Sequence, residues 1–257
     1  MGVRRKAAAG VALALGVTLV PAAEAKVVAS PENRFAVLVG ITDYRSPTKD
    51  TVGGVGDVET VRKVLLNRGW RNDRIMVLTD EQATGARIRS GMQWLVDNSR
   101  AGQTFSFFHY SGHVKQNDGH ERLWPIDREF IADTTVASTL GKIRGSSWVN
   151  ISGCEAGGFA ESLPDSDTLF TASSGRYEKS YEHPDWKKSI WSGLVFDAGI
   201  HKGKADADGD KKVSVQEAVQ YAAPIAKQMT AAQRPYGRQT PVVLGDKRSL
   251  NLAAPRV

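Results

Sequence analysis

FSFFHYSGH (Phe105–His113) and, further along, WVNISGCEAGG (Trp148–Gly158) are the two stretches that decide the fold. Each is a short apolar run rich in aromatic and β-branched residues and ends in a turn of small residues, which is typical of a buried strand. Each turn carries one reactive side chain, His113 in the first and Cys154 in the second. Because the carboxyl ends of parallel strands meet at one edge of a sheet, we expect these two side chains to lie close together.

Cys154 is the only cysteine in the chain. A lone Cys with a His elsewhere in the sequence is a candidate nucleophile and base pair. Taken alone, a single Cys is more often a small buried hydrophobe, and a His after a strand is more often an ordinary loop residue. The occurrence of both at strand ends followed by small residues favours catalysis.

The remainder of the chain alternates between strands and helices, which predicts an α/β fold: a doubly wound, mostly parallel sheet with helices on both faces. Apolar residues at helical spacing, bounded by turn residues, predict the helices. The segments 43–56, 114–121 and 175–188 are polar and are expected to be loops. The expected strands are 34–42, 74–78, 105–113, 148–152, 168–174 and 239–244, and the expected helices are 57–69, 84–98, 134–143, 189–200 and 214–229.

The two stretches resemble the caspase and metacaspase family of cysteine peptidases. Metacaspases carry Tyr-Ser-Gly-His-Gly and then Asp-x-Cys-x-Ser-Gly. The first motif matches through His113, with Val114 in place of the last Gly. The second keeps Cys154 and Gly157, with Ser152 in place of the Asp and Ala156 in place of the Ser. By the order of its elements, the resemblance extends over residues 34–245.

The resemblance implies a caspase-like cysteine endopeptidase with a Cys-His dyad. Cys154 attacks the peptide carbonyl as a thiolate, and His113 protonates the leaving amine and helps to ionise the thiol. As in the family, backbone N–H groups of Cys154 and of a residue near Gly112 are expected to bind the oxyanion. Val114 narrows the backbone angles open to that turn, which places turnover in question rather than the fold.

The resemblance also implies a substrate preference. Caspases that cut after Asp carry an Arg six residues before the Asp that opens the first helix, and here that position is Thr51. Metacaspases cut after Arg or Lys with the helix-opening Asp, which matches Asp57, and a second Asp, which Ser152 replaces; Ser111 matches a further polar residue of that pocket. We therefore expect cleavage after Arg or Lys. The ordinary alternative for Asp57 is a helix N-cap.

Residues 1–25 have the organisation of a secretory signal peptide. Three basic residues at positions 4–6 precede an apolar run that ends at Pro21, and Ala23-Glu24-Ala25 is an A-x-A cleavage site. The run is short for a membrane span. Cleavage after Ala25 leaves one domain, residues 26–257, in a secreted or periplasmic protein, and the formal charge falls from +6 to +4.

The segment DADGDKKVSVQE (Asp206–Glu217) fits the twelve-residue calcium loop of an EF-hand. The departure is Lys211 at the sixth position, where a Gly usually makes a left-handed turn. The alternative is a solvated acidic loop that caps a helix. Crowded carboxylates repel one another unless a cation neutralises them, so we expect Ca²⁺ here, bound by Asp206, Asp208, Asp210, the carbonyl of Lys212, Ser214 and Glu217.

Two other functions are compatible with the same residues. One is a catalytically inactive caspase fold that acts as a calcium-dependent binding module, favoured by Val114, Ser152 and Ala156. The other is a cysteine hydrolase of small amides. The expected partners are protein or peptide substrates. The spread of basic residues does not indicate nucleic-acid binding, and we expect no organic cofactor and no membrane association after cleavage of the signal peptide. The sequence does not specify the oligomeric state.

Overall fold

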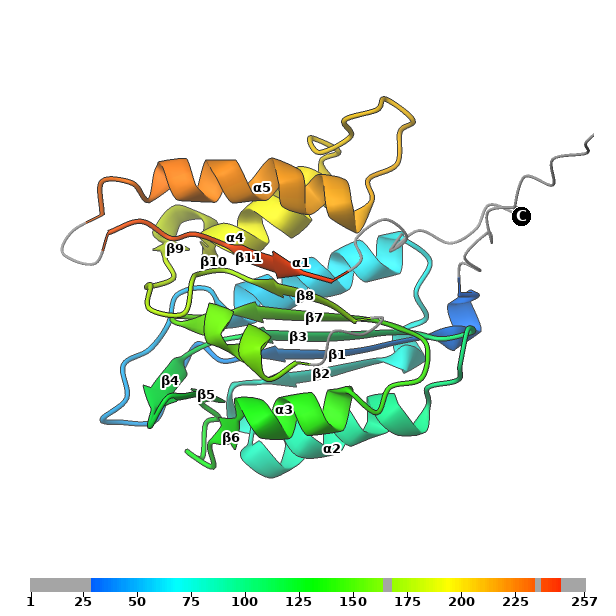
Figure 1. The fold of residues 1–257 in the computed structure, drawn as a ribbon. Coiled ribbons are helices and arrows are strands. Elements are labelled where there is room, and N and C mark those ends of the chain that lie inside the picture. The colour runs from blue at the N-terminus through cyan, green and yellow to red at the C-terminus, as the bar shows by residue number, and fades with distance from the viewer. Residues whose placement is uncertain (1–28, 164–167, 234–236, 246–257) are drawn as a thin grey trace, which may run out of the picture.

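A six-stranded sheet forms the centre of the protein in a computed structural model that describes residues 29–163, 168–233 and 237–245. The strand order is β11-β8-β7-β3-β1-β2, and every pair is parallel except β11 with β8 (Figure 1). The strands are β1 (Arg34–Gly40), β2 (Ile75–Thr79), β3 (Phe105–Ser111), β7 (Ser146–Ser152), β8 (Thr168–Ala172) and β11 (Val242–Leu244). The predicted doubly wound, mostly parallel sheet is confirmed.

Helices cover both faces of this sheet. One face carries α1 (Gly54–Asn67), α4 (Ile190–Ser192), the π-helix η6 (Gly193–His201) and α5 (Val215–Met229). The other carries α2 (Gly85–Asp97), α3 (Asp133–Leu140) and the 3₁₀ helix η4 (Ala156–Glu161). Further 3₁₀ turns are η1 (Pro31–Asn33), η2 (Asn72–Arg74), η3 (Asp80–Gln82) and η5 (Pro184–Trp186).

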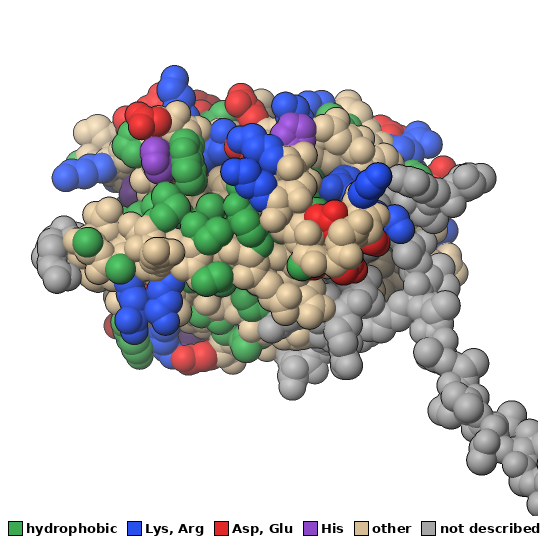
Figure 2. Space-filling model, turned by 90° about the horizontal axis from the view of Figure 1, so that it is seen from above, with side chains coloured by type: hydrophobic (Ala, Val, Ile, Leu, Met, Phe, Trp, Pro, Cys, Tyr) green, Lys and Arg blue, Asp and Glu red, His purple; other side chains and the backbone are tan. Residues whose placement is uncertain are grey.

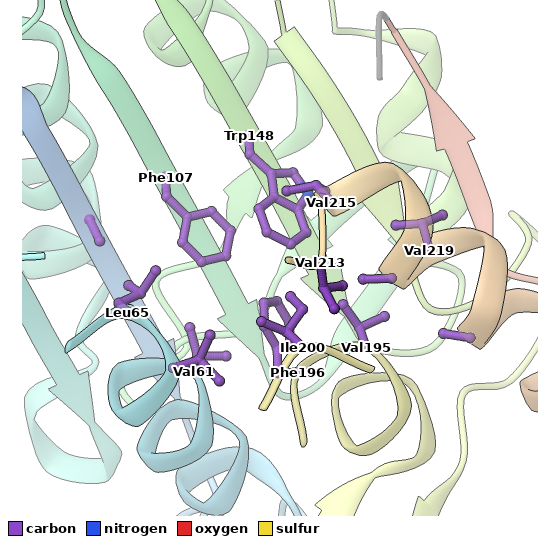
Figure 3. Packing of buried hydrophobic residues seen from close by; sticks show 14 of the residues in the cluster. Val61, Leu65, Phe107, Trp148, Val195, Phe196, Ile200, Val213, Val215 and Val219 are labelled. Carbon is purple, nitrogen blue, oxygen red and sulfur yellow. The ribbon is translucent and has the colours of Figure 1, made fainter. Parts of the chain in front are cut away.

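Each face of the sheet packs against its own apolar core. On the α1 side, Phe107 of β3 and Trp148 of β7 stack with ring centroids 4.5 Å apart, and residues of α1, η6 and α5 surround them (Figure 3). On the α2 side, Phe108 and Val149 of the same strands point the other way, into a second cluster. Both strands are buried throughout apart from partly exposed Ser146, as the continuous apolar runs predicted.

Polar side chains are also buried in the central strands. His109 of β3 accepts a hydrogen bond through Nδ1 from Asn150 of β7 (2.8 Å), and the Asn150 carbonyl oxygen accepts from Thr171 and Trp191. Burial lowers the pKa of His109 to about 3, so this imidazole is neutral and serves as an uncharged part of the core.

Three expectations about local structure were wrong. Segment 114–121 is not a loop but a hairpin of β4 (Val114–Asn117) and β5 (His120–Leu123), closed by Asp118 and Gly119 with positive φ and extended by β6 (Ile131–Ala132). Segment 189–200 is mostly π-helical rather than α-helical. The first helix, expected to begin at Asp57, begins three residues earlier at Gly54, so the alternative in which Asp57 is an N-cap does not apply.

The polar segment 175–188 is tied down by short elements. It includes β9 (Glu182–His183) and ends in β10 (Lys188–Ser189), which pairs with β9 in a small hairpin and packs on the start of α1. The face over α5 mixes apolar, basic and acidic side chains (Figure 2). The exposed large hydrophobic residues include Met229 of α5 and Leu244 of β11. Among the described residues, no helix has the length and apolar character needed to cross a membrane.

Candidate active site

The candidate active site lies beyond the carboxyl ends of β3 and β7. The pairing of these strands ends with Ser111 opposite Ser152, so His113 and Cys154 each follow two residues after that last pair. Both line one small cavity of about 90 Å³. The expected juxtaposition is therefore present. The full lining is Thr51, Ser111, Gly112, His113, Ser152, Gly153, Cys154, Ser180, Glu182 and Ser189.

His113 is held by the tyrosine and loop residues around it. Its backbone N–H donates to Tyr44 Oη (2.9 Å), and its carbonyl accepts from Tyr110 Oη (2.7 Å). The Tyr44 ring lies 4.6 Å from the imidazole, centroid to centroid. His113 Nε2 lies 2.7 Å from the carbonyl oxygen of Lys49, and a carbonyl can only accept, so Nε2 carries the proton. Nδ1 is then the nitrogen able to take a proton.

The Cys154 thiol is partly buried and contacts the backbone of Ser180. Sγ lies 3.5 Å from the Ser180 nitrogen and 3.9 Å from its oxygen. Burial raises the pKa of the thiol, while the Ser180 backbone and the charge of Lys179 act in the opposite direction. The resting group is therefore a thiol, and no hydrogen bond joins it to His113 within the described chain. Ionisation requires a proton acceptor during the reaction.

The oxyanion donors differ from the expectation. The N–H of Gly112 donates to the Ser152 carbonyl (3.1 Å), which continues the β3–β7 pairing, so naming Gly112 as a donor was wrong. The N–H of His113 is also used, by Tyr44. Val114 follows His113 and packs against the turn that carries Cys154. The contact is close enough that a Cβ added to Gly153 would lie 2.8 Å from Val114 Cγ2. The N–H of Cys154 has no acceptor in the described parts of the protein, and it remains a candidate donor.

Asp57 lies beneath the cavity and is fully buried. Its carboxylate accepts hydrogen bonds from Ser111 Oγ (2.7 Å), Ser189 Oγ (2.6 Å) and Ser189 N (3.0 Å). Burial raises the pKa of Asp57 to about 7, although these serine donors act to lower it. Ser152 lines the cavity with its hydroxyl buried and unpartnered in the described residues. The three predicted pocket residues are therefore brought together, with Asp57 reached through serine hydroxyls.

Glu182 is a pocket residue that the sequence did not reveal. It comes from β9, lines the cavity, and accepts hydrogen bonds from the N–H groups of Val52 (2.8 Å) and Gly53 (2.6 Å). Thr51 also lines the cavity, and the whole lining contains no Lys or Arg. Within the described residues the cavity is therefore acidic, with one carboxylate at its wall and a second beneath it.

The acidic loop lies away from the cavity, before α5. Asp206, Asp208 and Asp210 each offer a carboxylate oxygen within 4.8 Å of the others. Lys211 has φ +64°, the left-handed conformation that the sixth position of the motif requires. Glu217 accepts from the Ala207 N–H (3.1 Å) and forms a capping box with Ser214, so its carboxylate closes the loop onto the helix.

Comparison with known proteins agrees with the sequence motifs. The family description "Metacaspase, peptidase C14 domain" matches residues 34–140, a range that includes His113 but ends before Cys154. Metacaspase-9 of Arabidopsis thaliana is 32% identical over 148 residues, which is 51% of this chain and 45% of that protein. Metacaspase-1 of Lodderomyces elongisporus is 38% identical over 130 residues, or 42% of this chain and 28% of that protein. The chain thus spans less than half the length of these relatives.

Two solved structures share the fold. Caspase-1 from Spodoptera frugiperda superposes with a TM-score of 0.67 at 12% identity, over 89% of this chain and 93% of that one. Protein GSU0716 from Geobacter sulfurreducens superposes with a TM-score of 0.63 at 12% identity, over 87% of this chain and 100% of that one. Together the sequence matches and the shared fold confirm the resemblance to the caspase and metacaspase-like C14 family.

Proposed function

We propose that this caspase and metacaspase-like chain is a cysteine endopeptidase that uses Cys154 and His113 and cuts after Arg or Lys. The observation that carries the proposal is the single cavity that His113 and Cys154 both line, with the buried carboxylate of Asp57 bonded to Ser111 of the same lining. We also propose that residues 1–25 direct secretion or periplasmic export; they lie outside the described residues.

In the proposed reaction, His113 Nδ1 accepts the proton of the Cys154 thiol, and Sγ attacks the peptide carbonyl carbon. The oxyanion accepts hydrogen bonds from the backbone N–H of Cys154 and from that of Val114. His113 then gives its proton to the leaving amine, which leaves an acyl-enzyme that water hydrolyses. The Lys49 carbonyl keeps the imidazole in the tautomer that this sequence of transfers needs.

The preference for Arg or Lys rests on the charges around the cavity. A basic side chain that enters meets Glu182 at the wall and, through Ser111 and Ser189, Asp57 beneath. A bound cation favours the ionised form of Asp57, against the effect of burial. An acidic side chain meets no cation in the lining, so it is disfavoured.

We further propose that the loop 206–217 binds Ca²⁺. The donors fit: three mutually close carboxylates, the carbonyl of Lys212, the hydroxyl of Ser214 and the carboxylate of Glu217 supply hard oxygen ligands. When bound, the ion neutralises the crowded carboxylates and fixes the start of α5. It takes no part in the reaction at Cys154.

A peptide panel with Arg, Lys, Asp or Leu before the scissile bond, assayed with and without Ca²⁺, tests the proposal. We expect turnover of the Arg and Lys peptides. We also expect that an Arg peptide with a thiol-reactive warhead alkylates Cys154. Cleavage restricted to small amides indicates the hydrolase alternative. No cleavage and no warhead labelling in a folded protein indicates the binding module, which the Ser180 contacts to Sγ favour.

A further inference from the structure

Arg176 joins three segments around the active site, and the function described so far does not use it. Its guanidinium donates from Nη2 to the Gly119 carbonyl (2.6 Å), lies 3.4 Å from Glu121 through Nε, and forms an ion pair with Glu161 through Nη1. The side chain is 22% exposed, so it is largely covered by these neighbours.

Each contact leads to one part of the candidate active site. Gly119 and Glu121 lie in the β4–β5 hairpin, which begins immediately after His113. Glu161 ends η4, which begins two residues after Cys154. Arg176 therefore bonds to both segments that follow the proposed catalytic residues.

Arg176 also belongs to the loop that contacts the thiol. Two residues later, the carbonyl of Glu178 accepts from the N–H of Glu155, the residue after Cys154 (2.8 Å). Glu155 has φ +59°, a left-handed conformation that costs a non-glycine residue free energy and needs such support. Ser180 of the same loop contacts Sγ.

Arg176 lies beside a buried negative charge, the carboxylate of Glu121. Glu121 is fully buried; one of its oxygens accepts from Gln116 (2.8 Å), and the other has no hydrogen-bond partner in the described residues. A Cβ on Gly158 would come within 2.0 Å of the Glu121 carboxyl carbon, so η4 packs directly on this carboxylate. A buried carboxylate of this kind needs a nearby cation, and the guanidinium provides it.

We propose that Arg176 is a positioning residue that holds the β4–β5 hairpin, η4 and the loop 175–181 in one arrangement. Through Glu178 and Glu155 it fixes the Cys154 turn, and through the hairpin it fixes the segment that follows His113. The inference rests on the proposed peptidase function for its kinetic readout. It leaves the cavity carboxylates Asp57 and Glu182 untouched, so it separates positioning from substrate recognition.

The test compares Arg176→Ala and Arg176→Lys with wild type on an Arg peptide. We expect kcat to fall by about 10- to 100-fold in Arg176→Ala, because small misplacements of reacting groups have effects of this size, while KM changes by less than about threefold. Arg176→Lys keeps the positive charge but loses the forked set of N–H donors, so we expect its kcat to lie between those of Arg176→Ala and wild type. Guanidinium chloride at low, non-denaturing concentration restores several-fold activity to Arg176→Ala only.

Arg89→Ala is the matched control. Arg89 likewise bonds to more than one acidic or carbonyl group, with an ion pair to Glu129 (3.3 Å) and bonds to the carbonyls of Glu129 and Phe130, but it lies on α2 outside the cavity. We expect neither a loss of kcat nor a response to guanidinium there. Wild-type kcat in Arg176→Ala, or a folded variant that neither guanidinium nor Lys improves, overturns the proposal.

Two additions keep the test informative. If Arg176→Ala does not fold because Glu121 is left unpaired, the double variant Arg176→Met with Glu121→Gln removes the buried charge; we expect it to fold and still show the low kcat, and wild-type kcat there refutes the inference. If wild type cleaves no peptide, the rate of Cys154 alkylation by iodoacetamide replaces kcat. We expect a several-fold faster rate in Arg176→Ala, reversed by guanidinium, and an unchanged rate overturns the proposal.

Discussion

The cavity and the acidic loop both concentrate polar groups, but they satisfy those groups by different means. Around the cavity, Asp57 is buried and its oxygens are bonded to serines from two other segments of the chain. In the loop, Asp206, Asp208 and Asp210 are only partly buried or exposed, and they accept bonds from N–H groups of the loop itself. The cavity is therefore specified by tertiary structure, whereas the loop is specified by local sequence and is open to an ion.

Removing Cys154 or His113 should have the largest effect on the function proposed for the cavity. We expect Cys154→Ala and His113→Ala each to lower kcat/KM on Arg peptides by at least about 10³-fold, because residues that act as a unit fail together. Melting temperatures should stay within a few degrees of wild type. The measurement is initial rate against enzyme concentration, and full activity in Cys154→Ala would show that another group is the nucleophile.

The sequence predicted this part of the molecule well for a physical reason. Continuous apolar runs identify buried strands, and strand ends are where reactive groups gather, so β3, β7, His113 and Cys154 followed from local patterns. Asp57 was named only through the family resemblance, and its serine partners Ser111 and Ser189 lie 54 and 132 positions away. No local pattern encodes such contacts, which is also why Glu182 was missed.

The hairpin after His113 was missed for a different reason. Its strands are short, and two of the positions that alternate inward carry polar residues, Gln116 and the buried Glu121, so the sequence does not show the apolar and polar alternation of a half-buried strand. Gly112 was named as an oxyanion donor only through the family resemblance, which places a donor near this residue. In the structure the N–H of Gly112 continues the hydrogen bonding between β3 and β7 and donates to the Ser152 carbonyl.

The stability of the folded protein should depend on pH through the buried Asp57 beneath the cavity. The folded pKa of Asp57 is about 7, against an ordinary value near 4, so the folded protein binds more protons and the free energy of unfolding falls as pH rises from about 4 to 7. The largest effect is about 4 kcal/mol. The lowered pKa of His109 acts in the opposite direction: it makes the free energy of unfolding rise as pH rises from about 3 to about 6.5.

Asp57→Asn isolates the Asp57 contribution, because His109 is unchanged in it. Urea unfolding at pH 5 and pH 7.5 should show that the variant gains stability relative to wild type at the higher pH. An identical pH dependence in the two proteins would mean that Asp57 does not titrate in this range.

Substrate preference tests whether the carboxylates of Asp57 and Glu182 recognise a basic side chain in the cavity. We expect Asp57→Asn and Glu182→Gln each to lower kcat/KM on Arg peptides by about 10- to 100-fold, since one nearby carboxylate contributes a few kcal/mol before desolvation is subtracted. Peptides with a neutral residue before the scissile bond should change by less than about threefold. Equal losses on both kinds of peptide would indicate a damaged site rather than a lost charge.

Calcium should have the smallest effect, and it should act on the loop. At ten times the dissociation constant, binding adds about 1.4 kcal/mol to the free energy of unfolding. The melting temperature should rise with millimolar Ca²⁺, and Asp206→Ala or Glu217→Ala should remove the rise while the exposed Asp185→Ala outside the loop keeps it. The absence of a calorimetric binding signal at millimolar Ca²⁺ would rule out the site.

The wall of the cavity depends on residues that are translated late. The carbonyl oxygen of the Gln239 side chain accepts from the Tyr181 N–H (2.9 Å), and Thr240 donates to Glu178 through its N–H (2.6 Å) and its hydroxyl (3.0 Å), across 62 positions of sequence. A nascent chain that has already exposed His113 and Cys154 therefore lacks the clamp on the loop beside the thiol. Any reaction at Cys154 that needs this loop in place therefore has to wait until residues 239–240 have been made and have packed against it.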